Sequence, residues 1–170
     1  MRNSAIVILA ALVLVAALAL PAGALVKPGV RVKDLRLPDS QGTSQQLGQL
    51  IKGKVAMIIY WSLSCPHCQR EIPRLMRLAR RFSGNPFVVI TVNADGVEMA
   101  QAINAYAKQQ RIPGPYLIDA GPGDSLPFAD FFDLYTTPSI MVVDRGGRVT
   151  FADEAQVDMD ALIKAVQAAF

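Results

Sequence analysis

The sequence has few residues that can bind a metal, because two of its 170 residues are cysteine and one is histidine. A structural zinc site needs four soft ligands, and c-type haem attachment needs a histidine directly after the second cysteine of a C-x-x-C motif. Gln69 holds that position here. We therefore expect neither a metal site nor a cofactor.

Charge is also not concentrated in any one stretch of the sequence. Its formal net charge is +3, and its lysines and arginines are dispersed along the sequence. Nucleic-acid-binding proteins typically carry a basic stripe with interleaved aromatic residues, which is absent here. We therefore expect no nucleic-acid partner. Without its first two dozen residues, the chain is long enough for one domain with a proper core.

The N-terminus has the pattern of a targeting segment. Arg2 precedes the wholly apolar run Ala5–Leu20, and Ala22-Gly23-Ala24 then has the form of a cleavage site. The run is also long enough to stay in a membrane as an uncleaved anchor. Residues 1–24 are therefore interpreted as a signal peptide or a membrane anchor, and both alternatives place the remaining chain outside the cytoplasm.

Beyond a linker at 25–33, residues 34–170 show alternating strand and helix patterns. Apolar, β-branched runs indicate strands, and apolar residues recurring every three or four positions indicate helices. The expected strands are Val32–Leu37, Val55–Trp61, Phe87–Val92, Tyr116–Ile118, Ser139–Asp144 and Arg148–Ala152. The expected helices are Leu47–Ile51, Pro66–Phe82, Gly96–Gln110, Leu126–Leu134 and Asp158–Phe170. This order predicts an α/β fold in which a final β-hairpin completes a mixed sheet.

The two cysteines stand in the motif Cys65-Pro66-His67-Cys68, between a predicted strand and a predicted helix. Outside the cytoplasm, disulfide chemistry is the expected use of such a pair. Cys65 should cap the helix, where unpaired N–H groups and the helix dipole favour its thiolate. We therefore predict Cys65 as the nucleophile, and the more buried Cys68 as the residue that resolves the mixed disulfide.

Two neighbours of the cysteines are candidates for tuning this chemistry. The imidazole of His67 would stabilise the Cys65 thiolate if it lies near that sulfur, although it could also be a solvated residue of the first turn. Glu71 follows Cys68 by three residues and could handle its proton. The alternative for Glu71 is an exposed acid paired with Arg70 or Arg74.

Thr137-Pro138 directly precedes a predicted strand. A proline at the start of a strand that faces a redox motif is a candidate cis proline. It would leave the backbone edge of residue 137 free to pair with an extended substrate peptide. An ordinary trans turn proline is the alternative.

Together these motifs resemble the thioredoxin-like superfamily, and within it the TlpA/ResA/DsbE-type extracytoplasmic thiol–disulfide oxidoreductases. The resemblance covers almost all of residues 33–170. The matching residues are Leu37-Pro38-Asp39, Gly53-Lys54-Val55, Trp61, Cys65-Pro66-His67-Cys68, Glu71-Ile72-Pro73, Val92-Asn93, Thr137-Pro138 and Val143-Asp144-Arg145-Gly146-Gly147.

The resemblance implies a three-layer α/β/α fold with a central mixed sheet and a short N-terminal strand or hairpin extension. It implies that Glu71 is a redox-tuning acid, that Pro138 is cis, and that Thr137, Pro138 and Trp61 contribute to substrate binding. Ile59 stands where cytoplasmic thioredoxins carry a buried aspartate, which leaves proton handling to Glu71 or water.

The resemblance further implies reduction of disulfides in partner proteins, for example in cytochrome c maturation, with a membrane electron donor or acceptor recycling the pair. Pro66-His67 is also the dipeptide of the oxidase DsbA, so a disulfide-forming or isomerising enzyme is the alternative. A copper chaperone would need a distant histidine, which the chain lacks. A thiol peroxidase would need a Thr/Ser-x-x-Cys setting with an arginine partner, and Ser62-Leu63-Ser64-Cys65 only partly matches it.

Overall fold

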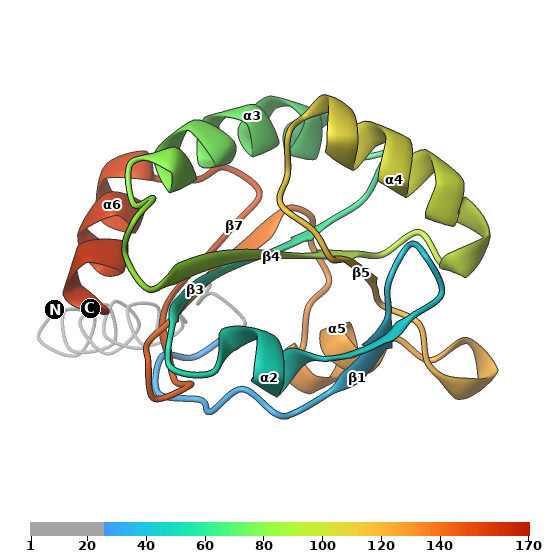
Figure 1. Cartoon of the computed structure of the whole chain (residues 1–170), viewed down its shortest axis with the longest axis horizontal. Coiled ribbons are helices and arrows are strands. Elements are labelled where there is room, and N and C mark those ends of the chain that lie inside the picture. The colour runs from blue at the N-terminus through green and yellow to red at the C-terminus, as the bar shows by residue number, and fades with distance from the viewer. Residues whose placement is uncertain (1–25) are drawn as a thin grey trace, which may run out of the picture.

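The computed structural model describes residues 26–170 as one five-stranded mixed sheet with helices on both faces and a separate two-stranded sheet (Figure 1). The large sheet has the strand order β5-β4-β3-β6-β7, and β1 pairs with β2 in the small one. The predicted thioredoxin-like α/β fold with an N-terminal extension is therefore confirmed. The strands are β1 Arg36–Pro38, β2 Ser44–Gln46, β3 Val55–Trp61, β4 Phe87–Asn93, β5 Tyr116–Ile118, β6 Ser139–Val143 and β7 Val149–Glu154. The helices are α2 Leu47–Ile51, α3 Pro66–Arg80, η1 Val97–Met99, α4 Ala100–Gln109, η2 Pro122–Asp124, α5 Pro127–Phe132 and α6 Met159–Ala168.

The central strand β3 is buried along all of its seven residues. It pairs in parallel with β4 and antiparallel with β6, so both of its edges are hydrogen-bonded. Because successive side chains of a strand point to opposite faces, Met57 and Ile59 join one apolar cluster while Ile58 and Tyr60 join another. An uninterrupted apolar run is the pattern expected of a strand covered on both faces.

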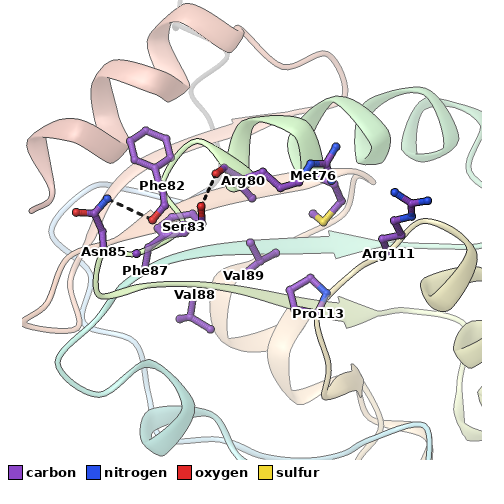
Figure 2. A pocket seen from close by; sticks show the side chains of 12 residues that line it. Met76, Arg80, Phe82, Ser83, Asn85, Phe87, Val88, Val89, Arg111 and Pro113 are labelled. Carbon is purple, nitrogen blue, oxygen red and sulfur yellow. Dashed lines mark hydrogen bonds between the residues drawn. The ribbon is translucent and has the colours of Figure 1, made fainter.

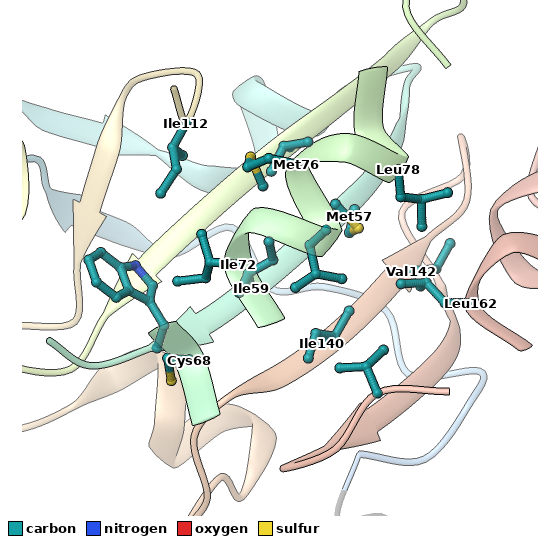
Figure 3. Close-up of a cluster of buried hydrophobic side chains, with 14 of the residues drawn as sticks. Met57, Ile59, Cys68, Ile72, Met76, Leu78, Ile112, Ile140, Val142 and Leu162 are labelled. Carbon is teal, nitrogen blue, oxygen red and sulfur yellow. The ribbon is translucent and has the colours of Figure 1, made fainter. Parts of the chain in front are cut away.

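Helices cover the two faces unequally. Buried residues of α3, α4 and α6 belong to the cluster on one face, and those of α2 and α5 belong to the cluster on the other. Figure 3 shows the first cluster, in which Ile72 of α3 lies next to Ile59 of β3, and Leu78 of α3 lies near Val142 of β6. Cys68 is part of this cluster and is fully buried, so the second cysteine of the motif is anchored in the core.

The N-terminal part of the described chain differs from its prediction. The expected strand Val32–Leu37 is reduced to β1, and the polar strand β2 was not predicted because its sequence is Ser-Gln-Gln. Residues 26–33 form no helix or strand, and they contact the domain. The N–H of Gly29 donates to the carbonyl of Val149, and Val26 is buried. The predicted signal peptide or anchor, 1–24, lies outside the described residues, and within 26–170 no helix has the length and apolar character needed to span a membrane.

The parallel strands bring the functional loops together. The carboxyl ends of β3, β4 and β5 lie side by side, since Trp61 pairs with Asn93 and Asn93 pairs with Ile118. The start of β6 joins them, because Ser139 pairs with Tyr60. We call this the redox end of the sheet, since the loop that leads from β3 to the cysteines begins there.

Candidate redox site

Cys65 is the N-cap residue of α3, as the sequence predicts. Its backbone is extended, and its sulfur accepts a hydrogen bond of 3.0 Å from the N–H of Cys68. Pro66 occupies the first turn, where a missing N–H costs no helical hydrogen bond. The N–H of Cys68 and the helix dipole both stabilise negative charge on the Cys65 sulfur once the disulfide is reduced.

The two cysteines are joined as a disulfide, with a Cα–Cα distance of 5.3 Å. Cys65 is 8% exposed and Cys68 is fully buried. An attacking thiolate can therefore reach Cys65 far more readily than Cys68. This asymmetry is what separate nucleophilic and resolving roles require.

The loop before β6 lies against the first cysteine. The peptide bond Thr137-Pro138 is cis, and the carbonyl oxygen of Thr137 lies 3.2 Å from the Cys65 sulfur. The hydroxyl of Ser139 donates to the carbonyl of Thr136 at 2.6 Å and closes the turn. The backbone of Thr137 thus lies directly beside the reactive sulfur. Gly114-Pro115 is a second cis bond, which the sequence analysis did not predict.

His67 is exposed, and its Nδ1 lies 2.9 Å from a guanidinium nitrogen of Arg70. Because a guanidinium can only donate, Nδ1 accepts, and a proton on the ring then belongs on Nε2. The ring is therefore held by Arg70 on the surface of the first turns of α3. The effect of His67 on the Cys65 thiolate stays a prediction.

Glu71 combines features of both alternatives considered for it. It is buried, at 6% exposure, on the same face of α3 as Cys68. Both of its carboxylate oxygens accept hydrogen bonds of 2.9 Å from one nitrogen of Arg74. The acid is therefore neither exposed nor unpaired. It lies three residues after the resolving cysteine, about one helical turn, where side chains on one face of a helix are neighbours.

Trp61 does not lie on the surface. Its side chain is 1% exposed, and its ring stacks on Tyr106 of α4 with the centroids 5.0 Å apart. A covered ring cannot contact a substrate protein in this conformation, so the predicted substrate contact is replaced here by a core contact. Ile59 is likewise fully buried in the apolar cluster, so no acid stands at that position beneath the cysteines.

A polar network that was not predicted from the sequence lies behind the cysteine loop. The carboxylate of Asp95 accepts from the Ser62 hydroxyl at 2.6 Å, from the Leu63 N–H at 2.7 Å and from the Asn93 side chain at 2.9 Å. Ser62 also lies 2.9 Å from the Ser64 hydroxyl, directly before the first cysteine. The sequence does indicate such a network, because the polar residues Ser62 and Asp95 follow the carboxyl ends of the adjacent parallel strands β3 and β4.

Comparison with known proteins agrees with this geometry. A family model described as the AhpC/TSA family matches residues 28–152. A thiol-disulfide oxidoreductase ResA of Halalkalibacterium halodurans is 25% identical over 126 residues, which cover 74% of this chain and 68% of the relative. A thiol:disulfide interchange protein DsbE of Allochromatium vinosum is 26% identical over 135 residues, covering 79% and 70%.

Solved structures show the same fold. The thioredoxin domain of a thiol-disulfide oxidoreductase from Bacteroides vulgatus superposes with a TM-score of 0.69 at 20% identity, covering 84% of this chain and 96% of that one. A thiol:disulfide interchange protein of the thioredoxin family from Chlorobium tepidum gives 0.65 at 20% identity, covering 87% and 99%.

Proposed function

Because the chain belongs to the AhpC/TSA family, as a thiol–disulfide oxidoreductase, we propose that it works outside the cytoplasm and reduces disulfides of partner proteins. The observation that carries the proposal is the setting of Cys65. Its sulfur lies between the N–H of Cys68 and the carbonyl of Thr137 and can be reached from solvent, while its partner sulfur is buried.

In the reduced protein, the Cys65 thiolate attacks one sulfur of a substrate disulfide. A mixed disulfide forms, and the other substrate sulfur leaves as a thiolate. The Cys68 thiolate then attacks the Cys65 sulfur, which closes the disulfide seen here and releases the second substrate thiol. Two electrons pass to the substrate, and a dithiol donor must return them. We propose a membrane protein as that donor and apocytochrome c as one substrate.

Thr137 and Pro138 are proposed to receive the substrate backbone, because the edge of residue 137 lies beside the sulfur under attack. Glu71 is proposed to take the Cys68 proton as this thiol becomes the nucleophile. We assign Trp61 a supporting role, since its ring packs between the strand that carries the cysteine loop and α4.

A matched pair of variants tests the proposal. With Cys68→Ser, the mixed disulfide cannot be resolved, so partner proteins should accumulate as covalent adducts on Cys65. With Cys65→Ser, adducts should be absent and disulfide reduction should stop. Adducts of equal abundance in both variants, or activity that persists in Cys65→Ser, would refute the assignment.

The competing function is disulfide formation, which the Pro66-His67 dipeptide favours. It uses the same two sulfurs with electrons flowing in the opposite direction. The two are separated by the redox state of the Cys65–Cys68 pair in the cell, measured on the unchanged chain, which should be reduced for a reductase and oxidised for an oxidase.

A further inference from the structure

The end of the sheet opposite the redox end carries a concentration of positive charge. We call it the basal end, because β3 and β4 begin there, with Val55 opposite Phe87. The turn between β6 and β7 lies at the same end, since Val143 pairs with Val149 and lies next to Ala56. The helix α3 also ends there (Figure 1).

A cavity of about 210 Å³ at the basal end is bordered by three exposed cations, Arg31, Lys52 and Arg145. They come from three separate segments: the N-terminal stretch, the turn after α2 and the β6–β7 turn. A guanidinium nitrogen of Arg31 donates to the carbonyl of Gly146 at 2.7 Å, which fixes the N-terminal stretch against that turn. Like charges from three segments thus meet at one hollow of the surface.

A second, larger cavity of about 410 Å³ adds apolar surface at this end. Figure 2 shows Phe82, Phe87 and Val89 lining it, with Arg80 and Arg111 among its bordering residues. Both arginines are exposed. Cations around an apolar hollow suit the boundary between headgroups and acyl chains, because their stems contact apolar groups while their charges stay in water.

A group of acidic side chains lies at the opposite, redox end of the sheet. Asp95 and Glu98 follow the carboxyl end of β4, and Asp124 follows that of β5, so these acids lie toward the redox end. Two acids lie near the first cavity, and backbone groups bind both of them: Asp144 accepts from the N–H of Arg148 at 2.9 Å, and Asp34 accepts from the N–H of Gly48, a lining residue, at 2.9 Å. Among residues 26–170 the ion pair that forms is Glu71–Arg74, which leaves the basal cations without a carboxylate partner there.

We propose that the basal end rests on the surface of an anionic lipid bilayer. The charge is complementary to such a surface, and the chain joins the domain at this end, because Gly29 pairs with Val149 where β7 begins. The segment before it contains the apolar run Ala5–Leu20. Juxtamembrane cations are attracted to anionic leaflets. This orientation turns Cys65 away from the lipid and toward soluble partners, and it does not depend on the direction of electron flow.

The test uses the full chain in lipid nanodiscs of phosphatidylcholine alone, or with phosphatidylglycerol added. A water-soluble acetylating reagent measures the reactivity of Lys52, with Lys164 on α6 as the reference in the same molecule. Acetylation of Lys52 relative to Lys164 should slow by about fivefold in the anionic discs and not in the neutral ones, since one Lys or Arg near such a surface gains about that factor.

Lys54 is exposed and directly precedes β3, so it also lies at the basal end. A charge-reversed variant, Arg145→Glu with Lys54→Glu, should restore the ratio seen in neutral discs. Arg36→Glu with Arg70→Glu changes the net charge equally, with Arg70 in the first turns of α3 near the redox end, and should leave the slowing intact. A ratio that is the same in both lipids overturns the proposal. Slowing that grows with protein concentration without lipid would assign the face to a second copy, and slowing produced only by added DNA would assign it to nucleic acid. Both results also overturn it. Insulin reduction, measured in parallel, tests the redox function separately.

Discussion

The sulfur of Cys65 lies 3.2 Å from the carbonyl oxygen of Thr137, which is 72 residues further along the chain. The same sulfur accepts the N–H of Cys68 at 3.0 Å. The carbonyl oxygen of Thr137 can accept the proton of the Cys65 thiol, and the N–H of Cys68 stabilises the Cys65 thiolate. The β3–α3 loop and the loop before β6 therefore meet at the reacting atom, and the backbone of residue 137 is in place to receive a substrate chain.

His67→Pro tests whether the imidazole influences the redox pair. If the ring stabilises the reduced form, its loss should lower the reduction potential by about 30 mV, which corresponds to about tenfold in the equilibrium constant. Arg70→Gln retains the ring but removes the guanidinium that binds its Nδ1, and serves as the control. A potential unchanged in His67→Pro would mean that His67 is electrostatically silent.

Glu71→Gln should slow resolution of the mixed disulfide, because the buried acid is one helical turn from Cys68. General acid–base catalysis typically contributes 10²-fold or more, so we expect a rate loss of about that size in stopped-flow measurements. The substitution preserves the shape of the side chain, so a loss of rate reports the missing carboxylate and not a change of packing.

Arg74→Gln is the matched control for Glu71, since it breaks the same ion pair and leaves the acid in place. The resolution step should then keep most of its rate. An equal loss in Arg74→Gln and Glu71→Gln would show that the pair acts structurally, with no proton transfer through the carboxylate.

Asp95→Asn should destabilise the cysteine loop, because one carboxylate accepts hydrogen bonds from Ser62, Leu63 and Asn93. Hydrogen bonds to a charged group contribute about 1.5–3 kcal/mol each. A loss of about 2 kcal/mol should lower Tm by roughly 4–8 °C in a chain of this size. Thermal unfolding followed by circular dichroism measures it.

The double variant Asp95→Asn with Ser62→Ala shows whether these residues act together. Residues in one hydrogen-bonded network give non-additive changes in the free energy of unfolding, by about 0.5–3 kcal/mol. Strictly additive effects would mean that Asp95 does not support the loop through Ser62.

Asp119 should give the protein a pH-dependent stability. The side chain is fully buried, and burial raises its pKa above the usual 3.8, although the N–H groups of Phe128 and Ala129 bind its oxygens and oppose this shift. The folded protein therefore holds the proton more tightly than the unfolded chain. The resulting stability is present below the ordinary pKa and is lost as the pH rises through the folded-state pKa.

Urea unfolding at several pH values from 3.8 upward measures this contribution. The free energy of unfolding should fall less steeply with rising pH in Asp119→Asn than in the unchanged protein. Asp124→Asn, at an exposed residue of η2, is the control. Equal pH slopes in all three proteins would show that Asp119 contributes nothing to the dependence.

Much of this fold could be predicted because its signals are local. The apolar run of β3 and the three- and four-residue periodicity of α3 depend on neighbouring residues, and both elements lie within two residues of their expected bounds. Proline at the first helical position likewise indicated that Cys65 caps the helix. The polar strand β2 carries no such signal, since it forms by pairing with β1.

Contacts between distant segments were harder to predict. The sequence marked Thr137-Pro138 as a cis candidate, but nothing in it indicated how closely residue 137 approaches the Cys65 sulfur. Asp95 reaches the cysteine loop only because β4 lies beside β3. Trp61 is the last residue of the strand before the motif, yet it points into the core, because alternation along β3 directs it to the face covered by α4.

The reduction potential of the Cys65–Cys68 pair tests the central claim most directly. It can be measured by equilibrating the full chain with glutathione or dithiothreitol buffers and quantifying the free thiols. The proposed reductase should have a potential well below about −200 mV, so that its dithiol can pass electrons to substrate disulfides. A value near −120 mV, typical of a strong oxidant such as DsbA, would contradict the proposal.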